Sequence, residues 1–125
     1  MRVFIIFNVI FFGFSQLIMA QNCSLDASLC KIRSLLIEKK SEENIKIEYL
    51  KNKPALQINN HVFPISENTH IKLGSDNSVE FFLQKGTAIT DVNDPAFKRA
   101  YWQINFASKN ACKQFIKYFN CLKYH

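Results

Sequence analysis

Apolar residues follow two different periods along this chain, and the period divides the chain into three parts. Between residues 22 and 40 the apolar spacing is four, three and four residues, which predicts an amphipathic helix. The residues of this stripe are Leu25, Leu29, Ile32 and Leu36. From residue 45 the period falls to two, which predicts β-strands. After residue 107 the helical period returns, with an apolar face of Cys112, Phe115, Ile116, Phe119 and Leu122.

Turn residues divide the central part into short strands. One hairpin is expected around Asn59 and Asn60, which tolerate positive φ, and another through the GSDN turn at 74–77. Residues 87–92 can add a short strand, 93–97 are expected to form a loop, and the segment after it alternates cleanly. The pattern therefore predicts an α+β fold: an N-terminal helix, a mainly antiparallel sheet of five or six strands, and a C-terminal helix packed on it. A small β-barrel capped by the last helix is the alternative.

The first 20 residues have the pattern of a secretory signal peptide. Arg2 supplies a positive charge, a mostly apolar stretch follows, and Ala20 is the favoured cleavage position. The unbroken apolar stretch is shorter than the roughly 20 residues that cross a bilayer, so we expect no membrane span after signal removal. The sequence thus predicts a signal peptide at 1–20 and a single domain at 21–125 that is secreted or periplasmic.

The four cysteines are predicted to form structural disulfides. In a continuous helix, Cys23 and Cys30 are separated by roughly 10 Å of rise and Cys112 and Cys121 by roughly 13 Å, too far for a bond. The bridges should therefore link the two terminal segments. The favoured pairs are Cys30 with Cys112 and Cys23 with Cys121, and the swapped pairs are the alternative. A nine-residue step also turns a helix by about 900°, which points Cys121 away from Cys112.

The sequence shows no catalytic or metal-binding constellation. The histidines His61, His70 and His125 lack ligand spacing, so we expect neither a metal nor a cofactor. The acidic run at 91–94 lacks the Gly and Glu of a calcium loop and is better explained by Asx turns before Pro95. Glu80 has no identifiable second carboxylate for glycoside hydrolysis. An enzyme is therefore disfavoured, although the sequence leaves the question open.

The last helix carries the most suggestive charged feature. Lys109, Lys113 and Lys117 follow one another at spacings of four, and no acidic residue lies between them. Like charges at this spacing cost a few tenths of a kcal/mol each, which an acidic partner would relieve. A solvated helix face is the simpler explanation. Together with Tyr118, these lysines are the predicted partner-binding residues.

These features favour a small exported, non-enzymatic protein that binds a protein partner with an acidic surface, of the inhibitor, immunity or adaptor type. The alternative is a protein that binds anionic glycan or lipid surfaces through the basic helix face, and a small secreted hydrolase comes third. Nucleic acid is disfavoured because the basic residues are mostly lysine and the expected compartment contains little of it. The sequence does not indicate an oligomeric state.

Overall fold

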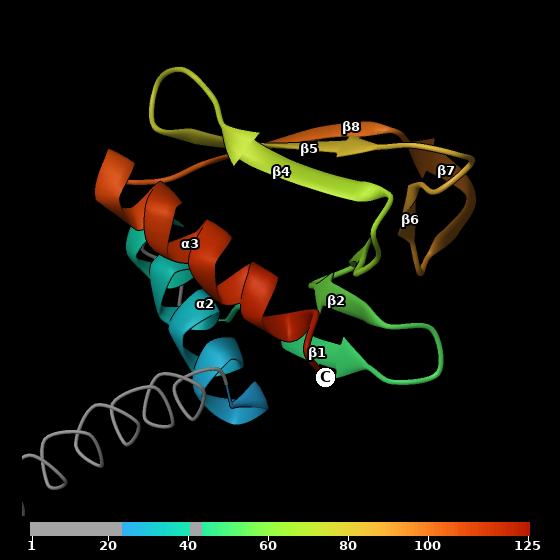
Figure 1. Cartoon of the computed structure of the whole chain (residues 1–125), viewed down its shortest axis with the longest axis horizontal. Coiled ribbons are helices and arrows are strands. Elements are labelled where there is room, and N and C mark those ends of the chain that lie inside the picture. The colour runs from blue at the N-terminus through green and yellow to red at the C-terminus, as the bar shows by residue number, and fades with distance from the viewer. Residues whose placement is uncertain (1–23, 41–43) are drawn as a thin grey trace, which may run out of the picture.

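The computed structural model describes residues 24–40 and 44–125, and within them the fold is α+β (Figure 1). The order along the chain is α2, then β1 to β8, then α3. The predicted signal peptide at 1–20 lies outside the described residues, as does Cys23. No helix of the described ranges is long and apolar enough to cross a membrane.

Both helices begin after a serine cap. They are α2 (Leu25–Lys40) and α3 (Lys109–Leu122). The Ser24 hydroxyl accepts a hydrogen bond from the backbone N–H of Ala27 at 3.3 Å. The Ser108 hydroxyl accepts one from the N–H of Ala111 at 3.1 Å. Each serine thus satisfies one of the N–H groups that the first turn of a helix leaves without an intrahelical partner.

The first sheet has five strands in the order β1-β2-β3-β6-β7 and is antiparallel throughout. Its strands are β1 (Ile47–Leu50), β2 (Ala55–Ile58), β3 (His61–Pro64), β6 (Ile89–Asp91) and β7 (Asp94–Arg99). The hairpin predicted around Asn59 is confirmed: β2 pairs with β3, and Asn59 has a φ of 54°. The pairing of β3 with β6 places His61 opposite Asp91.

The second sheet has three antiparallel strands in the order β4-β5-β8. Its strands are β4 (Thr69–Leu73), β5 (Ser78–Leu83) and β8 (Tyr101–Asn105). The predicted GSDN hairpin joins β4 to β5, with Asp76 and Asn77 at positive φ. Alternate residues of these strands point to opposite faces, so each strand has a core side and a solvent side.

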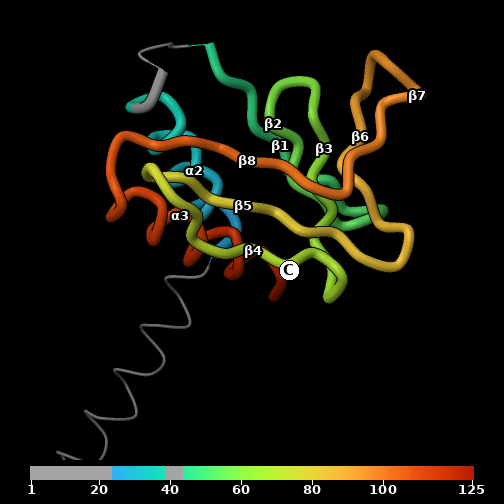
Figure 2. The backbone as a smooth tube through the Cα atoms, turned by 90° about the horizontal axis from the view of Figure 1, so that it is seen from above, coloured from blue at the N-terminus to red at the C-terminus, as the bar shows by residue number. Residues whose placement is uncertain are grey.

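The two sheets share one continuous stretch of chain. β7 ends at Arg99 and β8 begins at Tyr101, so the chain passes from the first sheet to the second at Ala100. Both helices lie on the same side of the three-stranded sheet, and no described element lies over its other side (Figure 1). Seen from above, β4, β5 and β8 run over the helices, while β1, β2, β3, β6 and β7 lie beyond their ends (Figure 2).

A cluster of aromatic rings fills the space between the helices and the sheets. The ring of Phe81 on β5 lies 4.9 Å from that of Phe63 on β3 and 5.6 Å from that of Phe119 on α3, measured between centroids. Ile32 of α2 and Ile104 of β8 are also buried in this core. The apolar faces predicted for the two helices and for the last strand therefore meet in one core.

The predicted single sheet of five or six strands is wrong, as is the barrel alternative. The described strands form two sheets that do not close into a barrel. The segment 93–97, expected as a loop, lies mostly in β7. The side chain of Asp91 accepts the N–H of Asn93 at 2.8 Å, and that of Asp94 accepts the N–H of Ala96 at 3.1 Å. The sequence predicts these Asx turns, and they reverse the chain between β6 and β7 to form a hairpin. β7 tolerates Pro95 because it is an edge strand.

Candidate functional site

The three lysines of the predicted partner-binding face lie on the exposed side of α3. Lys109, Lys113 and Lys117, here called the lysine face, are all exposed, while Phe115 and Phe119 on the opposite side of the helix are buried. The helical period explains this division, because residues four apart share a face. The structure therefore brings the three predicted lysines together on one surface.

No described acidic residue pairs with the lysine face. α3 contains no acidic residue, and no described carboxylate forms an ion pair with any of the three lysines. Lys109 also occupies the first turn, where the helix dipole disfavours a cation. Repulsion at spacings of four costs about 0.2–0.5 kcal/mol for each pair. The arrangement is therefore slightly unfavourable for the isolated domain.

Tyr118 is half-buried and lies beside the lysine face instead of within it. The Lys117 ammonium lies 5.4 Å from the centre of the Tyr118 ring. Tyr118 also packs against the hydrophobic core. Of the predicted site residues, it has the most evident structural role.

The uncovered side of the three-stranded sheet forms a second surface, here called the sheet face. The register places its residues in two rows across the strands, which are His70, Phe82 and Tyr101, then Lys72, Glu80 and Gln103. Tyr101 is 45% exposed, and its ring lies 5.2 Å from that of Phe82. The Lys72 ammonium lies 4.8 Å above the Phe82 ring and forms no ion pair with Glu80, which is directly opposite. Exposed aromatic residues are typical of protein-binding surfaces.

The hydroxyl of Tyr101 has an altered acidity. Desolvation raises the pKa of Tyr101 above its usual value of 10.0, and the charge of Glu80 and a hydrogen bond to that carboxylate raise it further. The hydroxyl lies 3.4 Å from Glu80 Oε1 and 3.3 Å from Gln103 Oε1. Tyr101, on the edge strand β8, is therefore a neutral hydrogen-bonding group of the sheet face at neutral pH.

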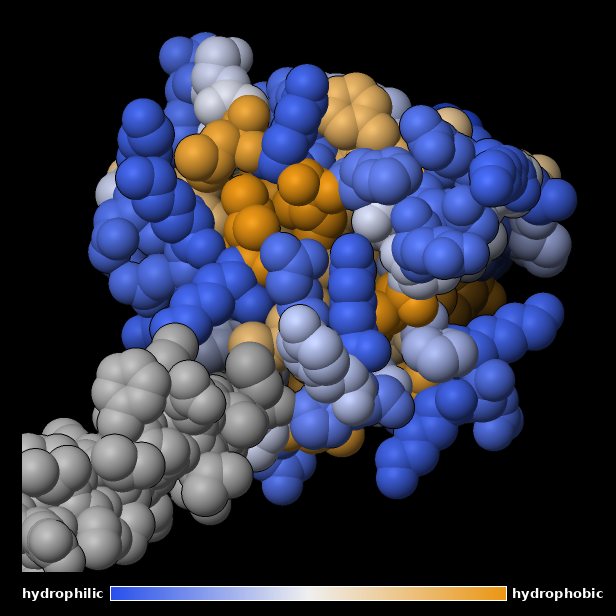
Figure 3. Space-filling view, in the orientation of Figure 1, coloured by the Kyte–Doolittle hydropathy of each residue, from blue (hydrophilic) through white to orange (hydrophobic). Residues whose placement is uncertain are grey.

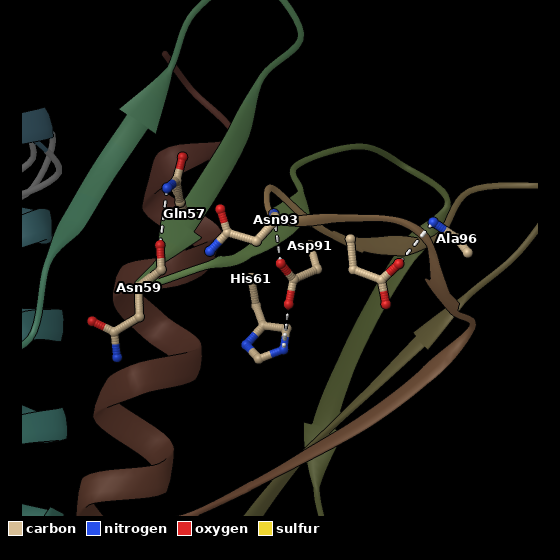
Figure 4. A network of polar contacts seen from close by, with 7 residues as sticks. Gln57, Asn59, His61, Asp91, Asn93 and Ala96 are labelled. Carbon is tan, nitrogen blue, oxygen red and sulfur yellow. Dashed lines mark hydrogen bonds and ion pairs between the residues drawn. The ribbon is translucent and has the colours of Figure 1, made fainter.

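A second polar constellation lies where the two sheets approach each other. His61 Nε2 is 3.6 Å from Asp91 Oδ2, and the other oxygen of Asp91 accepts the N–H of Asn93 (Figure 4). The His61 ring packs against Phe97 at 5.3 Å and Trp102 at 4.9 Å between ring centroids. The side chain of His61 is 33% exposed and that of Asp91 is 17% exposed.

His61 lines a small cleft, but it does not form a catalytic triad with Asp91 and a described nucleophile. The cleft has a volume of about 220 Å³ and is lined by His61, Trp102 and Asn59, among others. In the described part of the chain, no hydroxyl or thiol is hydrogen-bonded to His61, so the pair lacks the nucleophile of a Ser-His-Asp arrangement. The described residues also contain no cluster of three or more His, Cys, Asp or Glu that could hold a metal ion.

The structure contradicts one of the favoured disulfides. Cys30 and Cys112 are both free, Cys30 being exposed and Cys112 buried. The helical period gives the reason: Cys30 is two residues from both Ser28 and Ile32, which are buried, and so it points away from the core. Burial raises the pKa of the Cys112 thiol. Cys121 is disulfide-bonded, and its predicted partner Cys23 lies outside the described residues.

The sequence did not predict the pairing of His61 with Asp91 or the composition of the sheet face. His61 and Asp91 lie close together because β3 pairs with β6. No local sequence pattern predicts a pairing between strands so far apart in sequence. Glu80 and Phe82 stand out in sequence, but only the register adds Lys72, Tyr101 and Gln103 to them. The alternation of side chains in β4, β5 and β8, combined with the order of these strands, would have predicted this face.

No protein-family model matches this chain, and neither the curated proteins nor the solved structures include a significant match to it.

Proposed function

We propose that this chain is a small exported, non-enzymatic protein that binds a protein partner with an acidic surface, of the inhibitor, immunity or adaptor type. The observation that carries the proposal is the lysine face. Its three exposed lysines lie in a row on a helix without acidic residues, and none of them forms an ion pair with a described carboxylate. An acidic partner would replace the repulsion along this row with attraction. It would also increase the association rate through electrostatic steering.

The sheet face gives the same proposal a packed component. Interfaces use aromatic residues for much of their binding energy, and Phe82 and Tyr101 are adjacent on a face that no other element covers. A partner that contacts α3 and this sheet would combine charge with apolar burial. Binding by such an interface should lose only part of its affinity at high salt.

Affinity capture tests the proposal. The mature domain, residues 21–125, is immobilised and exposed to proteins of its own secretory compartment, and the retained proteins are identified by mass spectrometry. The triple variant Lys109→Gln, Lys113→Gln, Lys117→Gln should lose the specific partner. Retention of that partner by the variant would remove the lysine face from the proposal.

A matched variant controls for net charge. Lys51, Lys85 and Lys98 are all exposed and lie outside α3 and the sheet face. Their replacement by Gln changes the net charge by the same amount and should leave capture intact. Loss of capture in both variants would indicate attraction to total charge instead of a defined surface.

The lysine face also supports the second hypothesis, an anionic glycan or lipid surface. Ionic strength separates the two, because attraction to such a surface is mostly electrostatic and is screened over about 10 Å at 0.1 M salt. Binding to heparin or to phosphatidylserine vesicles that disappears at high salt, without a captured protein, would favour this alternative.

Export and a covalent link between the chain ends form the last part of the proposal. Cys121 is disulfide-bonded while Cys30 and Cys112 are free. We propose Cys23, the partner favoured from the sequence, as its partner. Such a bridge would require an oxidising compartment, in agreement with the predicted signal peptide. Closing a loop of about 100 residues stabilises a fold by about 4.7 kcal/mol in the chain-entropy account. Peptide mapping without reduction should recover a Cys23–Cys121 peptide, and any other pairing would refute this link.

A further inference from the structure

The outer edge of β4 is one of the two open edges of the second sheet. β4 and β8 are the end strands in the order β4-β5-β8, and β4 pairs with β5 alone. β7, an end strand of the first sheet, contains Pro95 and pairs with β6 through an irregular register, two devices that discourage further pairing. β4 has neither proline nor a shift in register.

The hydrogen bonds at both ends of the β4–β5 pair show which backbone groups remain free. Gln84 N–H donates to Asn68 O at 3.0 Å, and Gly74 N–H donates to Ser78 O at 2.9 Å. In an antiparallel pair the bonded residues alternate, so the even-numbered residues of β4 face β5. Ile71 and Leu73 therefore direct their N–H and C=O groups outward, and no backbone bond to another described residue outside the strand ladder satisfies them.

An apolar seam lies beside this edge. Leu73 is 37% exposed, and Ile71 of β4 and Ile116 of α3 are only partly buried. β4 and α3 contact each other. Figure 3 shows an apolar patch where these two elements adjoin, with hydrophilic side chains around it. A strand added to β4 would cover this patch with the side chains on its inner face.

The geometry points to a specific occupant, an extended segment of the partner with alternating apolar and acidic residues that adds to β4 as a fourth strand. Residues opposite Ile71 and Leu73 would fall on the α3 side, where apolar side chains bury the seam. Residues opposite Lys72 would fall on the sheet face, where its unpaired ammonium attracts a carboxylate. This inference rests on the proposed function and names the part of the acidic partner that binds.

A synthetic peptide tests the mode without the natural partner. The probe is a capped seven-residue peptide of alternating valine and glutamate, titrated against the whole mature protein by calorimetry. Two N-methylated versions are the matched controls, one with the methyl groups on the residues that bond to β4 and the other with them on the intervening residues. Methylation removes an N–H donor but leaves the charge of the peptide unchanged. The peptide methylated on the residues that bond to β4 should therefore lose at least tenfold in affinity, and the peptide methylated on the intervening residues should not. Equal affinities of the two methylated peptides would overturn the inference, as would no binding near 1 mM.

Protein variants and hydrogen exchange locate the peptide. Leu73→Glu places a like charge on the edge and should weaken binding of the parent peptide at least tenfold. Val92→Glu makes the same charge change at another exposed residue, 54% accessible in the β6–β7 turn, and should weaken it less than twofold. Bound peptide should slow amide exchange at Ile71 and Leu73 at least tenfold. Equal effects of the two variants, or unchanged exchange at these amides, would refute strand addition.

These outcomes are separate from those of the capture experiment. If the lysine-face variant loses the natural partner while the peptide shows no preference for the β4 edge, the proposed function stands and strand addition fails. If the peptide binds the edge but the lysine-face variant captures the partner normally, the lysine face is not part of the binding site. The edge of β4 then remains as the proposed site.

Discussion

Phe81 and Phe82 are consecutive residues of β5 with opposite surroundings. Phe81 is fully buried and touches rings from β3 and α3, whereas Phe82 lies on the sheet face beneath a lysine. The same three strands thus contribute to the core on one face and offer an aromatic, charged surface on the other. Consecutive residues of one strand therefore lie in the core and on the exposed surface. Substitutions on the core face should lower the stability more than substitutions on the sheet face.

The largest difference is expected between Phe81→Ala and Phe82→Ala. Removing Phe81 leaves a cavity among packed rings and should lower the free energy of unfolding by about 3–5 kcal/mol. Removing Phe82 loses one exposed ring contact and one cation–π contact, about 1 kcal/mol. Urea unfolding measures both. Equal losses would contradict the division between a structural and a solvent face.

The two free cysteines repeat this contrast between buried and exposed groups. Cys30 should react with iodoacetamide in the native protein, while Cys112 is buried and has a raised pKa. We expect Cys112 to react at least about 100-fold more slowly, which corresponds to about 2.7 kcal/mol of opening free energy. Peptide mapping of timed samples identifies each site, and urea should remove the difference. Rapid labelling of Cys112 in the native protein would show that α3 separates readily from the core.

The serine cap of α3 contributes to the stability of the helix, and removing it should have a smaller effect. Ser108→Ala removes the hydrogen bond to the N–H of Ala111 and should cost about 1 kcal/mol. Asn110→Ala is the control, because Asn110 is an exposed residue close to the same end of the helix. It should change the unfolding free energy by less than about 0.5 kcal/mol. A larger effect at Asn110 would place the start of the helix differently.

The smallest effect concerns acidity on the sheet face. Glu80→Gln removes the negative charge beside the Tyr101 hydroxyl, so the pKa of Tyr101 should fall while remaining above its usual value because desolvation persists. Ultraviolet titration of the phenolate, with Tyr101→Phe to assign the signal, measures this shift. Because the folded-state pKa is the higher one, this contribution to stability is present below about pH 10 and is lost as the pH rises through the folded value. An unchanged pKa would mean that Glu80 does not reach the hydroxyl.

Local patterns in the sequence predicted the local structure well. Both helices and the two hairpins follow from periodicity and from residues with known turn chemistry. In each case the signal lies within a few residues of the element that it specifies.

The failures concern strand pairings and faces that depend on distant parts of the chain. The division into two sheets is set by the β3–β6 and β5–β8 pairings, which join strands separated by long segments. The 93–97 segment was assigned to a loop because proline argues against a strand, yet its position at an edge made the strand acceptable. The disulfide prediction considered the distance between cysteines but not the face of α2 on which Cys30 lies.

The packing of α2 against α3 joins the first and last described elements of the chain. Phe115, Phe119 and Leu122 belong to the core, and they lie within the final 11 residues. A chain that emerges from its N-terminus cannot complete this core until α3 has emerged. For a chain that crosses a membrane unfolded, this arrangement delays folding until α3 has crossed.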